Sequence, residues 1–222
     1  MKNIPKTTDL FDIEYTICRD LFSECEYAHE IIPEIKRHFE AIRKKLVGRY
    51  FEIKKDVFVA ESAKIAEGAT ILGPTIVGED TEIRPGAYIR GGVIIGRGAV
   101  IGNSTEIKNS IIFDEAKLPH YNYVGDSIIG YRAHLGAGAI ASNQRLDKAE
   151  ISLGNGDGRV YTGLRKLGVL LGDYAEVGCG SVISPGTVIG RETVIYPLSH
   201  VKGVIPEACV FDGCSVKEKR NK

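Results

Sequence analysis

The chain has 222 residues, and its 29 basic and 29 acidic side chains give a formal net charge of +0. This balance argues against a nucleic-acid-binding surface, which needs an excess of cations. Tryptophan is absent, aromatic residues make up 8% and there are 26 glycines. Such a composition suits a narrow, repetitive core better than a thick sandwich.

The segment after Met1 is polar and charged, and no apolar run reaches 18 residues. We therefore expect neither a signal peptide nor a membrane span. The five cysteines include no CxxC pair and their number is odd. This pattern favours reduced thiols and a cytoplasmic location.

Residues 1–48 carry apolar side chains at helical spacing. Pro33 suits the first turn of a helix and Gly48 suits a helix stop. The spacing predicts a helical N-terminal region of two amphipathic helices with a bend near 27–33. Their apolar stripes would pack against each other, the next region or another subunit. The stripes are formed by Leu10, Ile13, Ile17 and Leu21, and by Ile35, Phe39, Ile42 and Leu46.

Over residues 49–216 the apolar period becomes six, which is typical of a β-helix built from hexapeptide repeats. Three hexapeptides form one coil, and coils stack about 4.8 Å apart. The sequence thus predicts a mainly β fold, a single-stranded parallel β-helix after the short α-helical region. Residues 217–222 are expected to be a disordered basic tail. The predicted inward positions are Ile53, Val59, Ile65, Ile71, Val77, Ile83, Ile89, Ile95, Ile101, Ile107 and Phe113, then Ile129, Leu135 and Ala141, and, after an insertion at 144–168, Leu171, Val177, Ile183, Ile189, Ile195 and Val201.

The stretch "LPHYNYVGDS" (118–127) interrupts this period. We expect the break to push backbone out of the coil, where protruding loops often carry function. A neutral imidazole is a suitable general base near neutral pH, so His120 is a candidate base. Tyr121 and Tyr123 would offer contact area beside it, and Asp126 is close enough in sequence to orient the imidazole. The alternative is that His120 packs or faces solvent.

Arg90 and Lys108 are 18 residues apart, so their side chains should be neighbours on successive coils. Two adjacent cations can hold a phosphate, but both can equally be solvated surface charges. Arg84 precedes Arg90 by six residues and should lie on a different face. The spacing leaves open which arginine would contact a phosphate.

The run "HLGAGAIASN" (134–143) places small residues in succession. A surface of glycine and alanine lets a long thin ligand approach backbone amides, although tight turns of the coil explain the run more simply. Asn143 ends it with an amide group. Arg165 and Lys166, in "GLRKLG", are either solvated loop charges or a second anion clamp.

No metal or nucleotide motif stands out in the sequence. His120, His134 and His200 are scattered, whereas a histidine-zinc enzyme resembling gamma-class carbonic anhydrase needs a close histidine pair and a third ligand. Neither GxxxxGK[ST] nor GxGxxG follows a predicted strand. We therefore expect no metal site and no nucleotide-binding domain of either type.

Five stretches resemble one known family. They are similar to the left-handed β-helix acetyltransferase domain of the bifunctional N-acetylglucosamine-1-phosphate uridyltransferase family, and more closely to the archaeal-type bifunctional sugar-1-phosphate nucleotidylyltransferase/acetyltransferases. Together they span about residues 50–205, and the resemblance implies a left-handed helix. The stretches are "YIRGG" (88–92), "EIKNSII" (106–112), "LPHYNYVGDSIIG" (118–130), "LGAGAIASN" (135–143) and "TGLRKLGVLLGD" (162–173).

The resemblance also implies roles for individual residues. In that family the histidine of this motif takes a proton from the 2-amino group of an amino-sugar 1-phosphate as the amine attacks acetyl-CoA, and here that histidine is His120. The family's trimers form each site between subunits, which implies a homotrimer. The implied substrate-binding residues are Arg90, Lys108, Tyr123, Asn143 and Lys166, and the implied acetyl-CoA-binding residues are Ala137, Cys179 and Pro197.

Three departures from the family pattern accompany these matches. Residues 1–48 are too short to replace the family's nucleotidyltransferase domain, so uridyl transfer is not expected. Position 134, commonly asparagine in the uridyltransferases, is histidine. Cys179 and Pro197 stand where small residues are usual.

The resemblance implies an acetyl-CoA-dependent N-acetyltransferase acting on an amino-sugar phosphate or a nucleotide-linked amino sugar. Acetyl transfer would need no metal, and no nucleic acid or membrane partner is expected. The alternative is a non-catalytic sugar-phosphate-binding or regulatory subunit whose helical region docks a partner.

Overall fold

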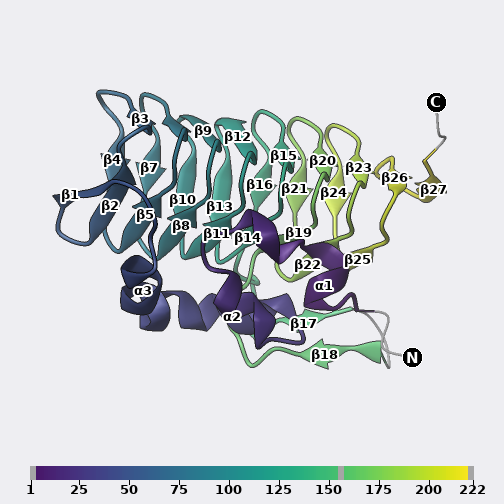
Figure 1. Cartoon of the computed structure of the whole chain (residues 1–222). Helices are drawn as coiled ribbons and strands as arrows, with labels where there is room; N and C mark the ends of the chain where they lie inside the picture. Colours follow the sequence, from purple (N-terminus) through teal and green to yellow (C-terminus); the bar gives the residue numbers. More distant parts are fainter. Residues whose placement is uncertain (1–3, 155–157, 220–222) are drawn as a thin grey trace.

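The computed structural model describes residues 4–154 and 158–219. From Val57 onward the chain winds as a left-handed parallel β-helix with its coils stacked side by side (Figure 1). Each coil passes through three sheets in the order B, C, A, and the turns between them form the B–C, C–A and A–B corners.

The strands are short because each coil turns a corner every few residues. Within the described residues, sheet A has nine strands, sheet B nine and sheet C seven. Sheet A contains β1 (Tyr50–Lys54), β2 (Val57–Ala60), β5 (Thr75–Val77), β8 (Val93–Ile95), β11 (Ser110–Ile112), β14 (Ile128–Ile129), β19 (Val169–Leu171), β22 (Thr187–Ile189) and β25 (Val204–Ile205). Sheet B contains β3 (Lys64–Ile65), β6 (Glu82–Ile83), β9 (Val100–Asn103), β12 (Lys117–His120), β15 (His134–Leu135), β20 (Glu176–Val177), β23 (Val194–Ile195), β26 (Cys209–Phe211) and β27 (Val216–Glu218). Sheet C contains β4 (Thr70–Ile71), β7 (Tyr88–Ile89), β10 (Glu106–Lys108), β13 (Tyr123–Gly125), β16 (Ile140–Ala141), β21 (Val182–Ile183) and β24 (His200–Val201), and the insertion adds a hairpin of β17 (Ser152–Leu153) and β18 (Val160–Tyr161).

The six-residue period is confirmed for most of the chain. The predicted positions from Val59 to Ile107 and from Ile129 to Val201 contribute to one apolar core inside the coils. Ile53 was predicted to point inward and this is wrong: it is 50% exposed on β1. The reason is that β1 runs antiparallel to β2 and covers the edge of the first coil instead of forming part of a coil.

Phe113 is the second exception, because the phase shifts before it. Ile112, not Phe113, takes the inward position, only five residues after Ile107. Asn109 lies between them with a left-handed φ of 44° and shortens the C–A corner by one residue. Phe113 points outward instead, into the packing beneath the helical region.

The stretch 118–127 does not leave the coil, so the expected protrusion is wrong. Leu118 and Val124 are both buried in the inner core, six residues apart. The next one-residue shortening falls between Val124 and Ile129, where Asp126 has a φ of 49°. The sequence break therefore marks two tight C–A corners and not a loop at His120.

The helical region covers the outward side of sheet A (Figure 1). Over residues 4–48 it comprises three short α-helices and two 3₁₀ helices, so it is more divided than the two helices predicted. No helix in the described part of the chain has the length and apolar character to cross a bilayer. The elements are α1 (Thr7–Leu10), η1 (Ile13–Tyr15), α2 (Arg19–Ser23), η2 (Ala28–Glu34) and α3 (Ile35–Lys44).

Contacts with the β-helix explain why the helices are divided. The backbone N–H of Asp173 donates to the Leu10 carbonyl (3.0 Å) and that of Asp114 to the Tyr15 carbonyl (3.0 Å). The Asp12 N–H donates to the Asp173 carboxylate (2.7 Å). These backbone groups bond to the A–B corner instead of to each other, so a continuous helix from Leu10 cannot form.

The opposite end of the chain also differs from expectation. The segment 217–222 was predicted to be disordered, but Val216–Glu218 form β27, which pairs antiparallel with β26. Residues 220–222 of that segment lie outside the described residues.

All five cysteines are free thiols.

Asp173 is a fully buried carboxylate in the contact between the helical region and the β-helix. It accepts hydrogen bonds from the N–H groups of Asp12 and Tyr131 (2.8 Å) and lies 3.4 Å from Arg191. Burial outweighs these partners and raises the pKa of Asp173 to about 6. The folded state therefore binds this proton more tightly than the unfolded chain does.

Because of this raised pKa, the Asp173 contribution to the free energy of unfolding should fall as pH rises from about 4 to 6. A shift of this size corresponds to about 2–3 kcal/mol. In Asp173→Asn the titration is removed, so wild type should gain stability relative to the variant as pH is lowered from 7 to 4. Denaturant titrations at each pH check this, with Asp80→Asn, at an exposed position of the same corner, as the control. Parallel pH profiles of wild type and Asp173→Asn would contradict it.

Candidate active site

His120 ends β12 and begins a column of residues along the B–C corner. The His120 carbonyl accepts the Gly138 N–H (3.1 Å), and the Ala137 carbonyl accepts the Gly180 N–H (2.8 Å). The Cys179 carbonyl accepts the N–H of Leu198 (2.9 Å). Together with the register of β20 and β23, these bonds align His120, Ala137, Cys179 and Pro197 on successive coils.

Two glycines, Gly138 and Gly180, lie beside this column. The next residue of each coil has a left-handed φ, and it is Tyr121, Gly138, Gly180 and Leu198 in turn. A Cβ atom added to Gly138 would meet no atom closer than 3.9 Å, whereas one added to Gly180 would lie 2.8 Å from the Leu198 side chain. Tyr121 and Leu198, both exposed, flank these two glycines, and we call this part of the surface the glycine slot.

The His120 side chain is exposed, and its imidazole makes no hydrogen bond within residues 4–154 and 158–219. Its backbone N–H donates to the Asn122 side chain (3.3 Å). Asp126 does not orient the imidazole, contrary to expectation, because its carboxylate bonds to groups at the C–A corner. The ring is thus accessible to a ligand and free to turn.

Gly102 supports the backbone under His120, and the sequence analysis did not single it out. A Cβ atom at position 102 would lie 1.5 Å from the Pro119 carbonyl oxygen. Only a residue without a side chain lets β9 and β12 approach this closely.

Gly102→Ala should therefore displace Pro119 and His120 together. We expect a loss of about 1–3 kcal/mol in the free energy of unfolding and a fall in turnover. The comparison variant is Gly68→Ala, at the same corner of an earlier coil, where nothing lies within 4 Å of the added atom. Its left-handed φ of 83° costs an alanine about 1 kcal/mol by itself, so it reports backbone strain without a clash. Calorimetry and a thiol-release assay check both effects. If Gly102→Ala lost no more stability than Gly68→Ala and kept full turnover, the close approach of β9 and β12 would be unimportant.

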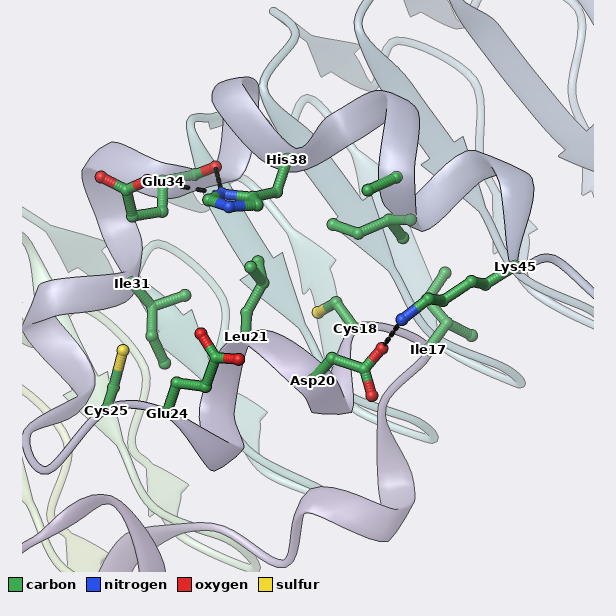
Figure 2. Close-up of a pocket in the computed structure, with 12 residues that line it drawn as sticks. Ile17, Cys18, Asp20, Leu21, Glu24, Cys25, Ile31, Glu34, His38 and Lys45 are labelled. Carbon is green, nitrogen blue, oxygen red and sulfur yellow. Dashed lines mark hydrogen bonds and ion pairs between the residues drawn. The ribbon is translucent and has the colours of Figure 1, made fainter.

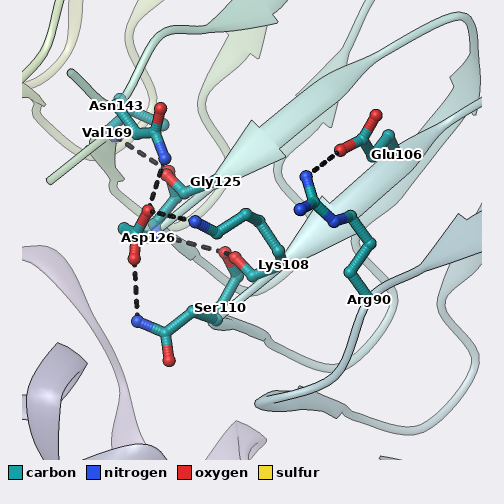
Figure 3. Close-up of polar contacts among 10 residues, drawn as sticks. Arg90, Glu106, Lys108, Ser110, Gly125, Asp126, Asn143 and Val169 are labelled. Carbon is teal, nitrogen blue, oxygen red and sulfur yellow. Dashed lines mark hydrogen bonds and ion pairs between the residues drawn. The ribbon is translucent and has the colours of Figure 1, made fainter. Parts of the chain in front are cut away.

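Arg90 and Lys108 are column neighbours at the C–A corner, as their spacing predicted, because Ile89 pairs with Ile107. Each has an acidic partner (Figure 3): Arg90 Nη1 lies 2.7 Å from Glu106, and Lys108 Nζ lies 3.4 Å from Asp126. The two cations are therefore not a bare phosphate clamp. The Arg90 pair is the more exposed, and such pairs are weak and easily exchanged.

Asp126 is the centre of the polar cluster in Figure 3. Its carboxylate accepts a hydrogen bond from Asn109 (2.9 Å) and another from the buried Asn143 amide, besides the Lys108 contact. This side chain is 7% exposed, so three donors offset the cost of burying its charge. Asp126 fixes the positions of Lys108 and Asn143.

Tyr123 lies next to this cluster on sheet C. A Cβ atom at Gly125 would lie 2.7 Å from both the Tyr123 hydroxyl and the Asn143 amide nitrogen, so the glycine allows the two groups to meet. Burial, with the carboxylates of Glu106 and Asp126, raises the pKa of Tyr123. Its hydroxyl is therefore protonated at neutral pH.

Two other predicted residues, Lys166 and Arg84, lie outside the Asp126 cluster. Lys166 is exposed, but the neighbouring Leu167 N–H donates to the Asn143 carbonyl (2.9 Å), which keeps the segment at the C–A corner. Arg84 pairs with Glu82 on the sheet B side. Thus the structure brings Arg90, and not Arg84, to the side of Lys108.

The two groups of residues lie at opposite ends of the strands of sheet C. The His120 column follows the B–C corner and the Asp126 cluster follows the C–A corner, with Tyr123 between them on β13. His134 is on sheet B and bonds to Glu176 (2.8 Å). Among the described residues, no group of three or more His, Cys, Asp or Glu side chains could hold a metal.

The left-handed β-helix is the fold of hexapeptide-repeat acyltransferases, and the relatives of this chain belong to that class. Residues 71–153 match the family model described as GMPPB C-terminal domain. The chain is 36% identical over 155 residues to a putative uncharacterized acetyltransferase, YaiX, of Escherichia coli K12, and the match covers 70% of this chain and 67% of that protein. The chain belongs to this hexapeptide-repeat acetyltransferase family.

Other relatives are similar over shorter segments. A bifunctional sugar-1-phosphate nucleotidylyltransferase/acetyltransferase of Sulfurisphaera tokodaii is 38% identical over 91 residues, 41% of this chain and 23% of that protein. Thus the chain matches about a quarter of the length of such bifunctional relatives. A solved hexapeptide transferase family protein from Anaplasma phagocytophilum is 18% identical with a TM-score of 0.41, and the match covers 72% of this chain and 77% of that one.

Proposed function

We propose that the protein transfers an acetyl group from acetyl-CoA to the amine of an amino-sugar phosphate or a nucleotide-linked amino sugar. The observation that carries this proposal is the column at the B–C corner. It puts His120 in line with Ala137, Cys179 and Pro197, the residues that the family resemblance assigns to the acyl donor.

The glycine slot fits a thin acyl-donor arm. The space above Gly138 is open, so a pantetheine-sized chain can contact backbone there, whereas the Leu198 side chain covers Gly180. The N–H groups of Ala137 and Cys179 have no acceptor in the described part of the chain and could stabilise a developing oxyanion. When bound, acetyl-CoA supplies the thioester that the amine attacks.

His120 acts as the general base in this proposal. Its exposed imidazole takes the proton that the acceptor amine loses as the new N–C bond forms and the C–S bond breaks. The proton then passes to the departing CoA thiolate, which leaves as the free thiol. Transfer is direct, without a covalent enzyme intermediate.

The acceptor would lie across sheet C. Arg90 is the proposed phosphate contact because its exposed pair with Glu106 is easily exchanged, while Asp126 holds Lys108 and Asn143 in place. Tyr123 would contact the sugar between the two corners, and Lys166 would approach from the insertion.

We also propose that the protein is a homotrimer with its sites between subunits. Sheet A is covered by the chain's own helices, and the outward side of sheet B carries Lys117, His134 and Glu176. Sheet C instead exposes Tyr88, Ile140 and Val182, each about 40% accessible. An exposed apolar face beside a functional site is typical of an interface. Light scattering after size-exclusion chromatography tests the trimer.

One observation favours the second candidate, a non-catalytic sugar-phosphate-binding subunit. The Leu198 side chain lies over Gly180 and fills part of the slot. The decisive experiment is thiol release from acetyl-CoA with glucosamine 1-phosphate and a panel of other amino sugars. Turnover supports the enzyme, whereas binding of the sugars without turnover on any of them supports the second candidate.

A further inference from the structure

A cavity lies inside the helical region, away from sheet C. It has a volume of about 420 Å³ and lies between α2 and the η2–α3 segment (Figure 2). This volume is within the usual range of small-molecule sites, about 300–1,000 Å³.

The inner wall of this cavity is apolar. Ile31 and Ile42 are buried behind it, and Ile17 and Leu21 line it with faces that remain partly exposed. The Cys18 thiol completes this wall, and burial raises its pKa to about 12, so it is an inert apolar group there. A ligand that covers Ile17 and Leu21 would remove apolar surface from water.

The rim of the cavity is acidic. Asp20 is paired with Lys45 across the opening, and Glu34 contacts His38. Glu24 projects toward the cavity in Figure 2 and has no ion-pair partner in residues 4–154 and 158–219. Burial raises the pKa of the Cys25 thiol, and the negative charges of Glu30, Glu24 and Glu34 raise it further. The negative charge of these acids is therefore felt at the wall of the cavity that Cys25 lines.

The existing ion pair limits what can enter. The Asp20–Lys45 contact joins α2 to the end of α3 across one side of the cavity. An incoming helix would have to break it, whereas a small molecule can enter beside Glu24. We propose that this cavity binds a small organic monocation, an amine on an aromatic or branched apolar body, with the apolar body against Leu21 and the ammonium group at Glu24.

The test uses the full chain and two probes of similar shape, phenethylamine and 2-phenylethanol. Cys25 lines the cavity and is partly exposed, so its rate of alkylation by iodoacetamide reports occupancy. Peptide-resolved mass spectrometry separates it from Cys214, an exposed thiol outside the cavity. Phenethylamine should slow labelling of Cys25 at a concentration where 2-phenylethanol has little effect, and labelling of Cys214 should not change.

Two variants separate the charge from the cavity. Glu24→Gln should weaken the amine about threefold, the size expected for a partly exposed charge contact, whereas Glu40→Gln, an exposed acid of α3 outside the cavity, should not. Ala41→Phe fills the cavity from an exposed position of α3 and should abolish protection of Cys25. Equal protection by the amine and the alcohol, or protection that survives Ala41→Phe, would overturn the proposal.

Discussion

Replacing His120 with alanine should lower turnover by about 10²–10⁴-fold, the usual contribution of a general base. The proposed substrate-binding residues at the C–A corner are untouched, so KM for the acceptor should change little. The fold should also be unaffected, because the imidazole is exposed and makes no hydrogen bond within the described residues.

The control for this prediction is His38→Ala, which removes a partly exposed histidine of α3. Steady-state kinetics by thiol release, with thermal unfolding of each variant, provide the measurement. Full activity of His120→Ala in an active protein would refute the role of His120 as base but leave the acetyl transfer itself standing. Loss of activity accompanied by unfolding would instead point to a structural role.

The family resemblance, and not the six-residue count, singled out Ala137, Cys179 and Pro197 from the sequence. The structure aligns them with His120 on successive coils. His120 and Asn143 were likewise identified by family motifs. What counting could not give is the tilt of each side chain, so Asp126 was assigned to His120 from sequence proximity when it belongs to the other corner.

The interruption of the six-residue period, which the sequence placed at 118–127, has a local physical cause. Asn109 and Asp126 each adopt a left-handed φ, which Asn and Asp tolerate better than most residues. Each shortens one corner by a residue, and the six-residue count then slips for everything that follows. The signal was present as a polar residue at a turn, but many other turns in this chain have similar residues without the shortening.

Gly102 illustrates a different limit. Most coils have a glycine after an inward residue, so nothing in the sequence distinguishes Gly102 from its equivalents. Its importance comes from the Pro119 carbonyl directly across the next coil, a contact defined only by three-dimensional register. The helical region shows the same limit, because the A–B corner competes for the backbone groups that would extend a helix.

Phe113→Ala should produce the largest loss of stability, about 3–5 kcal/mol, because it removes a fully buried aromatic ring. The ring stacks on Phe11 at a centroid distance of 5.3 Å and meets the edge of Phe22 at 5.1 Å. It is thus a main contact between the helical region and the outside of sheet A. The loss should be concentrated there and not in the inner core of the coils.

Equilibrium unfolding in urea measures the overall loss, with Phe51→Ala as a control on the exposed β1 strand. Amide hydrogen exchange locates it: protection in α2 should fall much further than in β12, because the inner core that holds β12 does not include Phe113. An equal loss of protection in both elements would mean that the helical region and the coils unfold as one unit. A loss below about 1 kcal/mol would mean that the helices are held mainly by their hydrogen bonds to Asp114 and Asp173.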